Sequence, residues 1–166
     1  MLVAELLRCG SEEGKEKAAG ALGNLAADED IAAAIVAAGT LPLLVELLRD
    51  GPSPSRKNAT LALGNLASGN DARKSAIVAA GVIPPLVELL RNGSDVDRVN
   101  AAKALANLAA GSAASKSAIV AAGAIPPLEA LLLGGLDEVK KYAAAALANL
   151  SCRNATASSI EVHWSK

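Results

Sequence analysis

The sequence predicts an all-helical fold of stacked repeats, and three observations support this prediction. Ala supplies 38 and Leu supplies 25 of the 166 residues, and both residue types favour helices. The residues that favour sheets are scarce, since Phe is absent and Tyr142 and Trp164 are the only aromatic residues. A sequence pattern also recurs at nearly constant intervals along the chain. We therefore expect an all-α repeat fold rather than an all-β fold.

The repeat is defined by three short signals. The string A-L-x-N-L recurs at nearly equal intervals, and its asparagines are Asn24, Asn65, Asn107 and Asn149. The glycine of an A-A-G string and a single proline recur at one constant interval, at Gly39, Gly81 and Gly123 and at Pro42, Pro84 and Pro126. Each of these prolines precedes the asparagine of its unit by the same distance along the chain, so the units share one internal register.

The first part of a unit is a short helix that ends at a sharp turn. In the second full unit, the spacing predicts this helix over 71–80. Gly81 follows it in the manner of a left-handed C-terminal cap. Pro84 and Pro85 suit the first turn of the next helix, where the missing backbone N–H costs nothing.

The rest of a unit is a medium helix followed by a longer one. Leucines recur at helical spacing within 86–92, and Gly93 ends this second helix. Ser94 or Asp95 then caps a third helix, which continues to Leu108. Each unit is therefore predicted to contain a short helix, a sharp turn, a medium helix, a loop and a long helix.

No such unit can bury its apolar face alone, whereas stacked units share one continuous core. Residues 2–8 are similar to the second helix at 86–91, so the chain is expected to begin within a unit. We divide the chain into a partial repeat at 1–26, full repeats at 27–68, 69–110 and 111–150, and a divergent C-terminal tail at 151–166.

The amino-acid sequence of the units resembles a known repeat family. The phrase A-I-V-A-A-G-V-I-P-P-L-V-E-L-L-R-N-G-S at 76–94, followed by A-x-x-A-L-A-N-L-A, resembles the armadillo repeat, and most of all the repeats of plant U-box armadillo proteins. The resemblance covers residues 1–150. It implies a right-handed superhelical solenoid of three-helix repeats, in which the third helices line a concave groove. Such grooves bind extended peptides or partner proteins.

The resemblance also suggests a role for the repeated asparagine. In armadillo proteins that hold extended peptides, this side chain hydrogen-bonds the peptide backbone. Asn is unfavourable within a helix, yet its amide carries both a donor and an acceptor, which suits contact with a main chain. Alternatively, each asparagine bonds the backbone of a neighbouring repeat and only fixes the stacking. Both interpretations remain open from the sequence.

One feature departs from the nuclear import adaptors of the family, which carry a Trp one turn before this asparagine. The corresponding residues are Gly20, Leu61, Lys103 and Ala145. None is aromatic, and one is a cation. The sequence therefore argues against the basic-peptide mode of those adaptors.

Basic residues recur near the start of each third helix, at Lys15, Lys17, Arg56, Lys57, Arg98, Lys140 and Lys141. Because the helix dipole disfavours cations there, their recurrence suggests contacts to acidic side chains of a partner. The alternative is a solvated rim that neighbouring acidic residues neutralise. The predicted partner-contact residues are Asn24, Asn65, Asn107, Asn149, Arg56, Lys57, Arg98, Lys103, Lys140, Lys141 and Tyr142.

Several other functions are not expected. The 16 basic and 17 acidic side chains give a net charge of −1, which does not favour nucleic acid. His163 is the only histidine, so neither a histidine-based catalytic pair nor a zinc site is predicted. We therefore predict no catalytic residue, no metal, no cofactor and no enzymatic activity.

The chain is expected to act inside the cell, in the cytoplasm or the nucleus. Cys9 and Cys152 lie far apart and form no disulfide framework, which is typical of a reducing compartment. Each is expected to be buried. The longest apolar stretch, at 117–128, is shorter than the roughly twenty residues that a membrane span needs, so no membrane contact is expected.

The function predicted from the sequence is a protein-interaction scaffold with a peptide-binding groove. One alternative is the substrate-recognition part of a U-box type ubiquitin ligase, and a second, disfavoured alternative is a nuclear import adaptor. The apolar residues at the start of the chain also suggest that it is a fragment of a longer array, or that it self-associates through an uncapped N-terminal end. The acidic residues at 28–30 are expected to be a solvated run in a linker.

Overall fold

The structure, a computed structural model, describes residues 2–158 and the side chains of residues 2–152. Eleven helices and no strand are found among these residues. The helices are α1 (Leu2–Cys9), α2 (Glu12–Leu25), α3 (Glu29–Ala37), α4 (Leu41–Asp50), α5 (Ser53–Leu66), α6 (Asp71–Ala79), α7 (Ile83–Asn92), α8 (Asp95–Ala109), α9 (Ala113–Ala121), α10 (Ile125–Gly134) and α11 (Asp137–Ser158).

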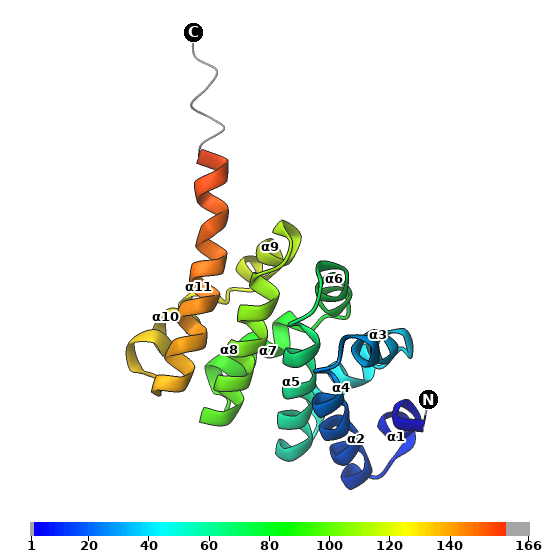
Figure 1. The fold of residues 1–166 in the computed structure, drawn as a ribbon. Helices are drawn as coiled ribbons and strands as arrows, with labels where there is room; N and C mark the ends of the chain where they lie inside the picture. Colours follow the sequence, from blue (N-terminus) through cyan, green and yellow to red (C-terminus); the bar gives the residue numbers. More distant parts are fainter. Residues whose placement is uncertain (1, 159–166) are drawn as a thin grey trace.

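The helices form a solenoid in which each type of helix makes its own row (Figure 1). The third helices α2, α5, α8 and α11 pack side by side in chain order, and each packs against the second helix of its own unit. The second helices are α1, α4, α7 and α10, and the first helices are α3, α6 and α9. The predicted all-α solenoid of three-helix units is confirmed.

The turn between the first and second helices depends on glycine. Gly81 has φ +83°, and Gly39 and Gly123 have φ +71° and +73°. A side chain at such angles is strained, so glycine is the residue that lets the chain reverse direction here. The two helices around Gly81 lie 77° apart. The predicted left-handed cap at this position is confirmed.

The predicted starts of the second and third helices are also confirmed. Proline occupies the first turn of α4, α7 and α10. Ser94 is the N-cap of α8, which resolves the choice between Ser94 and Asp95. Ser94 Oγ accepts from the backbone N–H of Asp97, and Asp97 Oδ2 accepts from the backbone N–H of Ser94. This reciprocal pair satisfies two donors that the helix itself leaves unpaired.

Small residues bring the third helices close together. An added Cβ at Gly64 on α5 would lie 3.5 Å from Ala104 Cβ on α8, and one at Gly23 on α2 would lie 3.5 Å from Ala62 on α5. The core between these helices consists of Ala and Leu, with Leu22, Leu63 and Leu105 at most 1% exposed. The high Ala content of the sequence therefore serves the close packing of neighbouring units.

The last third helix is longer than the others. α11 continues as a helix through residues 151–158, where the sequence-based division places the beginning of the tail. In Figure 1 its C-terminal part extends beyond the ends of the neighbouring third helices. The remainder of the tail, with His163 and Trp164, lies outside the described residues.

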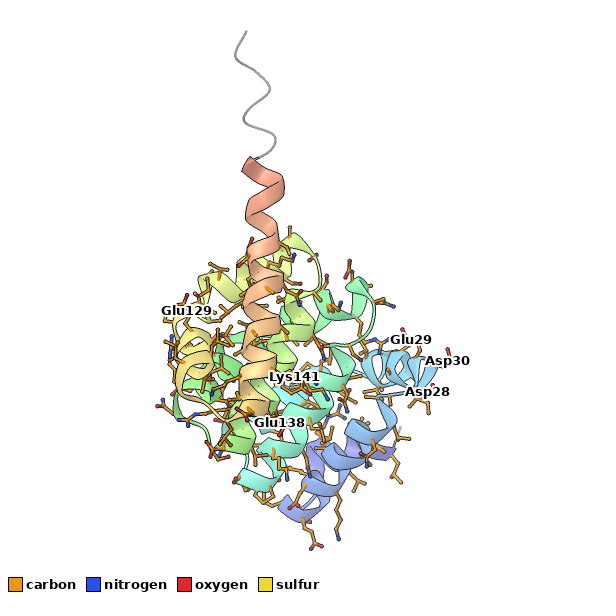
Figure 2. All side chains as sticks on the ribbon, turned by 60° about the vertical axis from the view of Figure 1, so that its left-hand side comes forward. Asp28, Glu29, Asp30, Glu129, Glu138 and Lys141 are labelled. Carbon is orange, nitrogen blue, oxygen red and sulfur yellow. The ribbon has the colours of Figure 1, made fainter. Side chains whose placement is uncertain are left out.

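Two expectations about individual side chains are wrong. The acidic residues at 28–30 do not form a linker, since Asp28 caps α3 and the other two residues form its first turn (Figure 2). Glu29 also forms an ion pair with Arg73 of α6, whose side chain is buried. Cys9 and Cys152 are both exposed rather than buried, because neither lies on the side of its helix that packs.

Within the described part of the chain, no single helix combines the length and the apolar character that a membrane crossing requires. Three pairs of first and second helices reach that length and composition only when they are joined, and each pair bends by 77° to 83°.

Candidate functional site

The repeated asparagines link neighbouring third helices. Asn65 Nδ2 donates to the carbonyl oxygen of Gly23 at 2.9 Å, and Asn107 Nδ2 donates to that of Gly64 at 2.9 Å. Asn149 Nδ2 donates to the carbonyl oxygen of Ala106 at 3.1 Å. In each case the acceptor is the residue just before the asparagine of the preceding unit. The stacking bond that the sequence left as one of two interpretations is thus formed.

These bonds do not use the whole amide group. An Asn side chain has two N–H donors and an acceptor oxygen, and the stacking bond takes one donor. Among the described residues, the Oδ1 atoms of Asn107 and Asn149 have no partner, and both side chains are half-buried. Asn24 is exposed on α2, which has no third helix before it to bond within the described part of the chain. A stacking role therefore leaves hydrogen-bonding capacity available to a ligand.

The size of the acceptor residue explains part of the sequence pattern. The variable position of A-L-x-N-L is Gly23, Gly64 and Ala106 in the first three copies, and all three residues are buried. A larger side chain there would push the neighbouring helix away and lengthen the asparagine bond. The stacking bond therefore requires both the asparagine of one repeat and the small residue of the preceding repeat.

One asparagine has both ends of its amide occupied. Lys103 on α8 donates from Nζ to Asn65 Oδ1 at 3.1 Å, while Asn65 Nδ2 donates to Gly23. Lys103 and Asn107 are four residues apart on α8, so they lie on the same face one turn apart. Together they form hydrogen bonds with the adjacent residues Gly64 and Asn65 of α5.

Other residues share the side of the third helices that carries the asparagines. At about 100° per residue, Tyr142 lies about 20° from the direction of Asn149, and Lys103 lies about 40° from that of Asn107. Lys57 and Lys141 lie about 80° from their asparagines. We call these four residues, together with Asn24, Asn65, Asn107 and Asn149, the asparagine face.

Lys141 and Tyr142 mark the C-terminal end of this face. Lys141 is exposed, and its Nζ lies 5.6 Å from the centre of the Tyr142 ring. Figure 2 shows Lys141 projecting from α11 on the side opposite Glu129 of α10. Tyr142 is half-buried and packs against the core. Its ring therefore has both a packing contact and a solvent-accessible part.

The structure places Arg56, Arg98 and Lys140 elsewhere. Each precedes its asparagine by nine positions, which turns it about 180° away from the asparagine face. Arg56 Nη2 lies 3.7 Å from Asp97 Oδ2, and Arg98 Nη1 lies 3.5 Å from Asp95 Oδ1. Lys140 Nζ lies 3.8 Å from Asp137 Oδ1. Acidic residues of the same or the neighbouring third helix therefore neutralise these cations, and the side chains of Arg56 and Arg98 are only 30% and 33% exposed.

Arg56 and Arg98 line a row of equivalent crevices between consecutive second helices. A cavity of about 360 Å³ lies between α4 and α7 and includes Arg49 and Arg56. A cavity of about 590 Å³ lies between α7 and α10 and includes Arg91 and Arg98. Sequence reasoning missed these crevices, although the recurrence of arginine at positions 49 and 91, one repeat apart, was the signal that could have revealed them.

The described residues contain no group of three or more His, Cys, Asp or Glu side chains that could hold a metal ion. The asparagine face offers amide groups, ammonium groups and one phenol. These groups can form hydrogen bonds and ion pairs along an extended surface.

A family model described as Armadillo/beta-catenin-like repeat matches residues 28–68, 70–110 and 112–152. No sequence among the curated proteins matches the chain. A designed armadillo repeat protein of known structure is 38% identical with a TM-score of 0.85, and the match covers 89% of this chain and 63% of that one.

Two further solved structures are similar. A designed armadillo repeat protein in complex with peptide (KR)4 is 36% identical with a TM-score of 0.84. A computationally designed armadillo repeat protein for modular peptide recognition is 38% identical with a TM-score of 0.83. Each match covers 89% of this chain and 62% of the other. The chain thus spans less than two thirds of the length of these designed proteins.

Proposed function

The chain belongs to the armadillo repeat family, and from this membership we propose that it binds an extended peptide segment along its asparagine face. The bound segment is either a free peptide or an extended part of a partner protein. Two of the similar designed proteins support this proposal, because one is in complex with a peptide and the other is described as made for modular peptide recognition.

The observation that carries the proposal is the fixed orientation of the asparagine amides. Asn107 and Asn149 are each held by one bond to the preceding third helix, at 2.9 and 3.1 Å. This bond fixes the direction of each amide and leaves its oxygen available to accept a peptide N–H. A donor or acceptor that is already oriented loses less entropy when a ligand binds.

The spacing of the third helices suits an extended chain. Packed helices are about 8–10 Å apart, and an extended chain advances about 3.3 Å per residue. Each unit therefore corresponds to two or three peptide residues. Because the face contains four third helices, a peptide of about eight residues reaches from α2 to α11.

Lys57, Lys103 and Lys141 favour acidic peptides, although Glu138 lies about 20° from the direction of Asn149 on the same side. Lys57 and Lys141 are exposed, and Lys103 is half-buried. The cation at Lys17 is balanced by Glu13, with Nζ and Oε1 2.5 Å apart. Oppositely charged groups on a ligand steer it to such a surface and fix its register, mainly at low salt. The proposed contact set leaves out Arg56, Arg98 and Lys140 because they lie on the opposite side.

Fluorescence polarisation tests the proposal directly. Two labelled eight-residue peptides, (EG)4 and (KR)4, are titrated against the protein and against the Asn107→Ala, Asn149→Ala double variant. We expect (EG)4 to bind and the double variant to bind it at least tenfold more weakly. Asn92→Ala on the exposed end of α7 is the matched control and should bind normally.

Two results would contradict this proposal. If (KR)4 binds and (EG)4 does not, the charge argument is wrong and the import-adaptor function gains support. If (EG)4 binds equally well to the double variant, the peptide uses another surface. Circular dichroism of each variant shows whether a lost affinity reflects lost structure.

The amino-acid sequence of the repeats supports a second candidate, the substrate-recognition part of a U-box type ubiquitin ligase. In that setting the same asparagine face would hold a segment of the ligase substrate, inside the cell. To test this candidate, this chain is fused to a U-box ligase that lacks its own repeats, and the fusion is purified. The transfer of ubiquitin to a protein that carries the (EG)4 segment is then measured. No transfer by the active fusion would contradict it.

A further inference from the structure

We propose that Lys103 makes the Asn65 position of the asparagine face a subsite for one acidic side chain of the bound segment. This inference rests on the proposed function, because it requires a peptide on that face. It deepens the proposal by naming the residue that selects the charge and the place where selection occurs.

The subsite is specific to one interface between units. The residues four positions before the other asparagines are Gly20, Leu61 and Ala145, none of which carries a polar side chain. Lys103 alone reaches back from its own helix, α8, to the asparagine of the preceding unit on α5. The asparagines of the face therefore recur in every unit, whereas the cation beside the asparagine is present only at Asn65.

The contact occupies the amide oxygen that other units leave available. Lys103 Nζ lies 3.1 Å from Asn65 Oδ1, and Asn65 Nδ2 lies 2.9 Å from the carbonyl oxygen of Gly23. A peptide N–H that passes Asn65 finds this oxygen already accepting from an ammonium group. At Asn107 and Asn149 the corresponding oxygens have no partner among the described residues. Backbone recognition through this oxygen is therefore expected to be stronger at those two positions than at Asn65.

The ammonium group replaces the lost backbone contact with a charged one. A lysine has three N–H donors, and Asn65 takes one of them. The other two can donate to a carboxylate, and such charge-assisted bonds are stronger than bonds between neutral groups. Because Lys103 is half-buried, solvent screens this pair less than an ion pair between exposed groups.

The charge of Lys103 has no acidic partner within the part of the chain that the structure describes. Asp95 and Asp97, the acidic residues of α8, lie close to Arg98 and Arg56. On the facing helix α5 there is no acidic residue. No ion pair within 4 Å joins Lys103 to another of the described residues. A ligand carboxylate would therefore bind without displacing a carboxylate of the protein.

A double-mutant cycle tests the subsite. The affinities of (EG)4 and of its four single Glu→Gln versions are measured by fluorescence polarisation with the unmodified protein, Lys103→Met and Lys103→Arg. Lys57→Met is the matched control, because it removes a cation of the same face at an exposed position. Circular dichroism confirms that each variant is folded.

We expect one of the four Glu→Gln changes to weaken binding to the unmodified protein about five- to tenfold. That loss should disappear with Lys103→Met, persist with Lys57→Met and be largely kept by Lys103→Arg. If the four losses are unchanged by Lys103→Met, the subsite is wrong although peptide binding stands. If no variant binds (EG)4 at all, the proposed function fails and the subsite with it.

Discussion

The second helices α7 and α10 occupy the same place in consecutive units, yet they differ in how much they bury. α10 buries only Leu128, whereas five residues of α7 are buried, namely Ile83, Leu86, Val87, Leu89 and Leu90. Leu90 is 2% exposed, while Leu132 at the same position of α10 is 38% exposed. The difference arises because α10 covers α7, and none of the described residues covers α10 in the same way.

The same contrast between inner and outer units appears in polar contacts. Arg91 of α7 donates from Nη2 to the carbonyl oxygen of Gly123 in the next unit at 3.2 Å. Leu133 stands at the equivalent position of α10 and is 85% exposed. Among the asparagines, Asn107 is bonded to its neighbour and Asn24 is not. The neighbouring unit buries residues of each unit and forms hydrogen bonds with them. How much a residue contributes to the free energy of unfolding therefore depends on whether a neighbouring unit contacts it.

The largest expected effect concerns the matched pair Leu90→Ala and Leu132→Ala. Leu90→Ala leaves a cavity between α7 and α10 and should lower the free energy of unfolding by about 2–5 kcal/mol. Leu132→Ala removes a partly exposed side chain and should cost less than about 1.5 kcal/mol. Urea denaturation followed by circular dichroism measures both. Equal losses would show that burial by the neighbouring unit does not set the stability of this position.

A smaller effect is expected for the asparagine bonds. Asn107→Ala removes the bond to Gly64 and should lower the free energy of unfolding by about 1 kcal/mol. Asn24→Ala removes no such bond and introduces a better helix former, so stability should stay the same or rise by a few tenths of a kcal/mol. Thermal melts of the two variants compare them directly, and a loss with Asn24→Ala as large as that with Asn107→Ala would contradict the stacking role.

The smallest effect on stability is expected for Leu133→Arg, which restores the residue type that Arg91 supplies in the preceding unit. Because Leu133 is exposed, its replacement should change the free energy of unfolding by less than about 0.5 kcal/mol. Its effect should instead appear in self-association. Leu133 and the nearby Leu136 are 85% and 56% exposed, and we propose that these apolar residues associate between copies.

Sedimentation velocity at increasing concentration tests this last prediction. We expect the unmodified protein to show larger species at high concentration and Leu133→Arg to show fewer of them. A single monomer species for both proteins over the full range would rule out self-association through this surface.

The helices and their caps could be predicted because their signals are local. Gly81 ends one helix and Ser94 begins another through contacts within three residues of each. The end of α11 could not be predicted in this way. Gly69 and Gly111 stand four positions after their asparagines and Arg153 stands there in the last unit, but Asp28 stands there in the first unit, where α2 still ends at Leu25, so this position alone does not set where a third helix ends.

The site was only partly predictable because its contacts join residues of different units. The asparagines were identified from their repetition, but their bonds to Gly23, Gly64 and Ala106 depend on how the units stack. The basic residues were grouped by their distance from the asparagines along the helix. Arg56 and Arg98 point to a different side of their helices than Lys57 does. Distance along the sequence alone does not show this difference.

The central claim is that the asparagine face contacts the backbone of an extended peptide, and the side-chain amides report on this directly. The sequence contains nine Asn and no Gln, so a ¹H–¹⁵N spectrum contains only nine side-chain NH₂ pairs. On titration with (EG)4, we predict shifts for Asn24, Asn107 and Asn149, with Asn70 and Asn92 unchanged as controls. Saturating binding that leaves the first three amides unchanged would contradict the account.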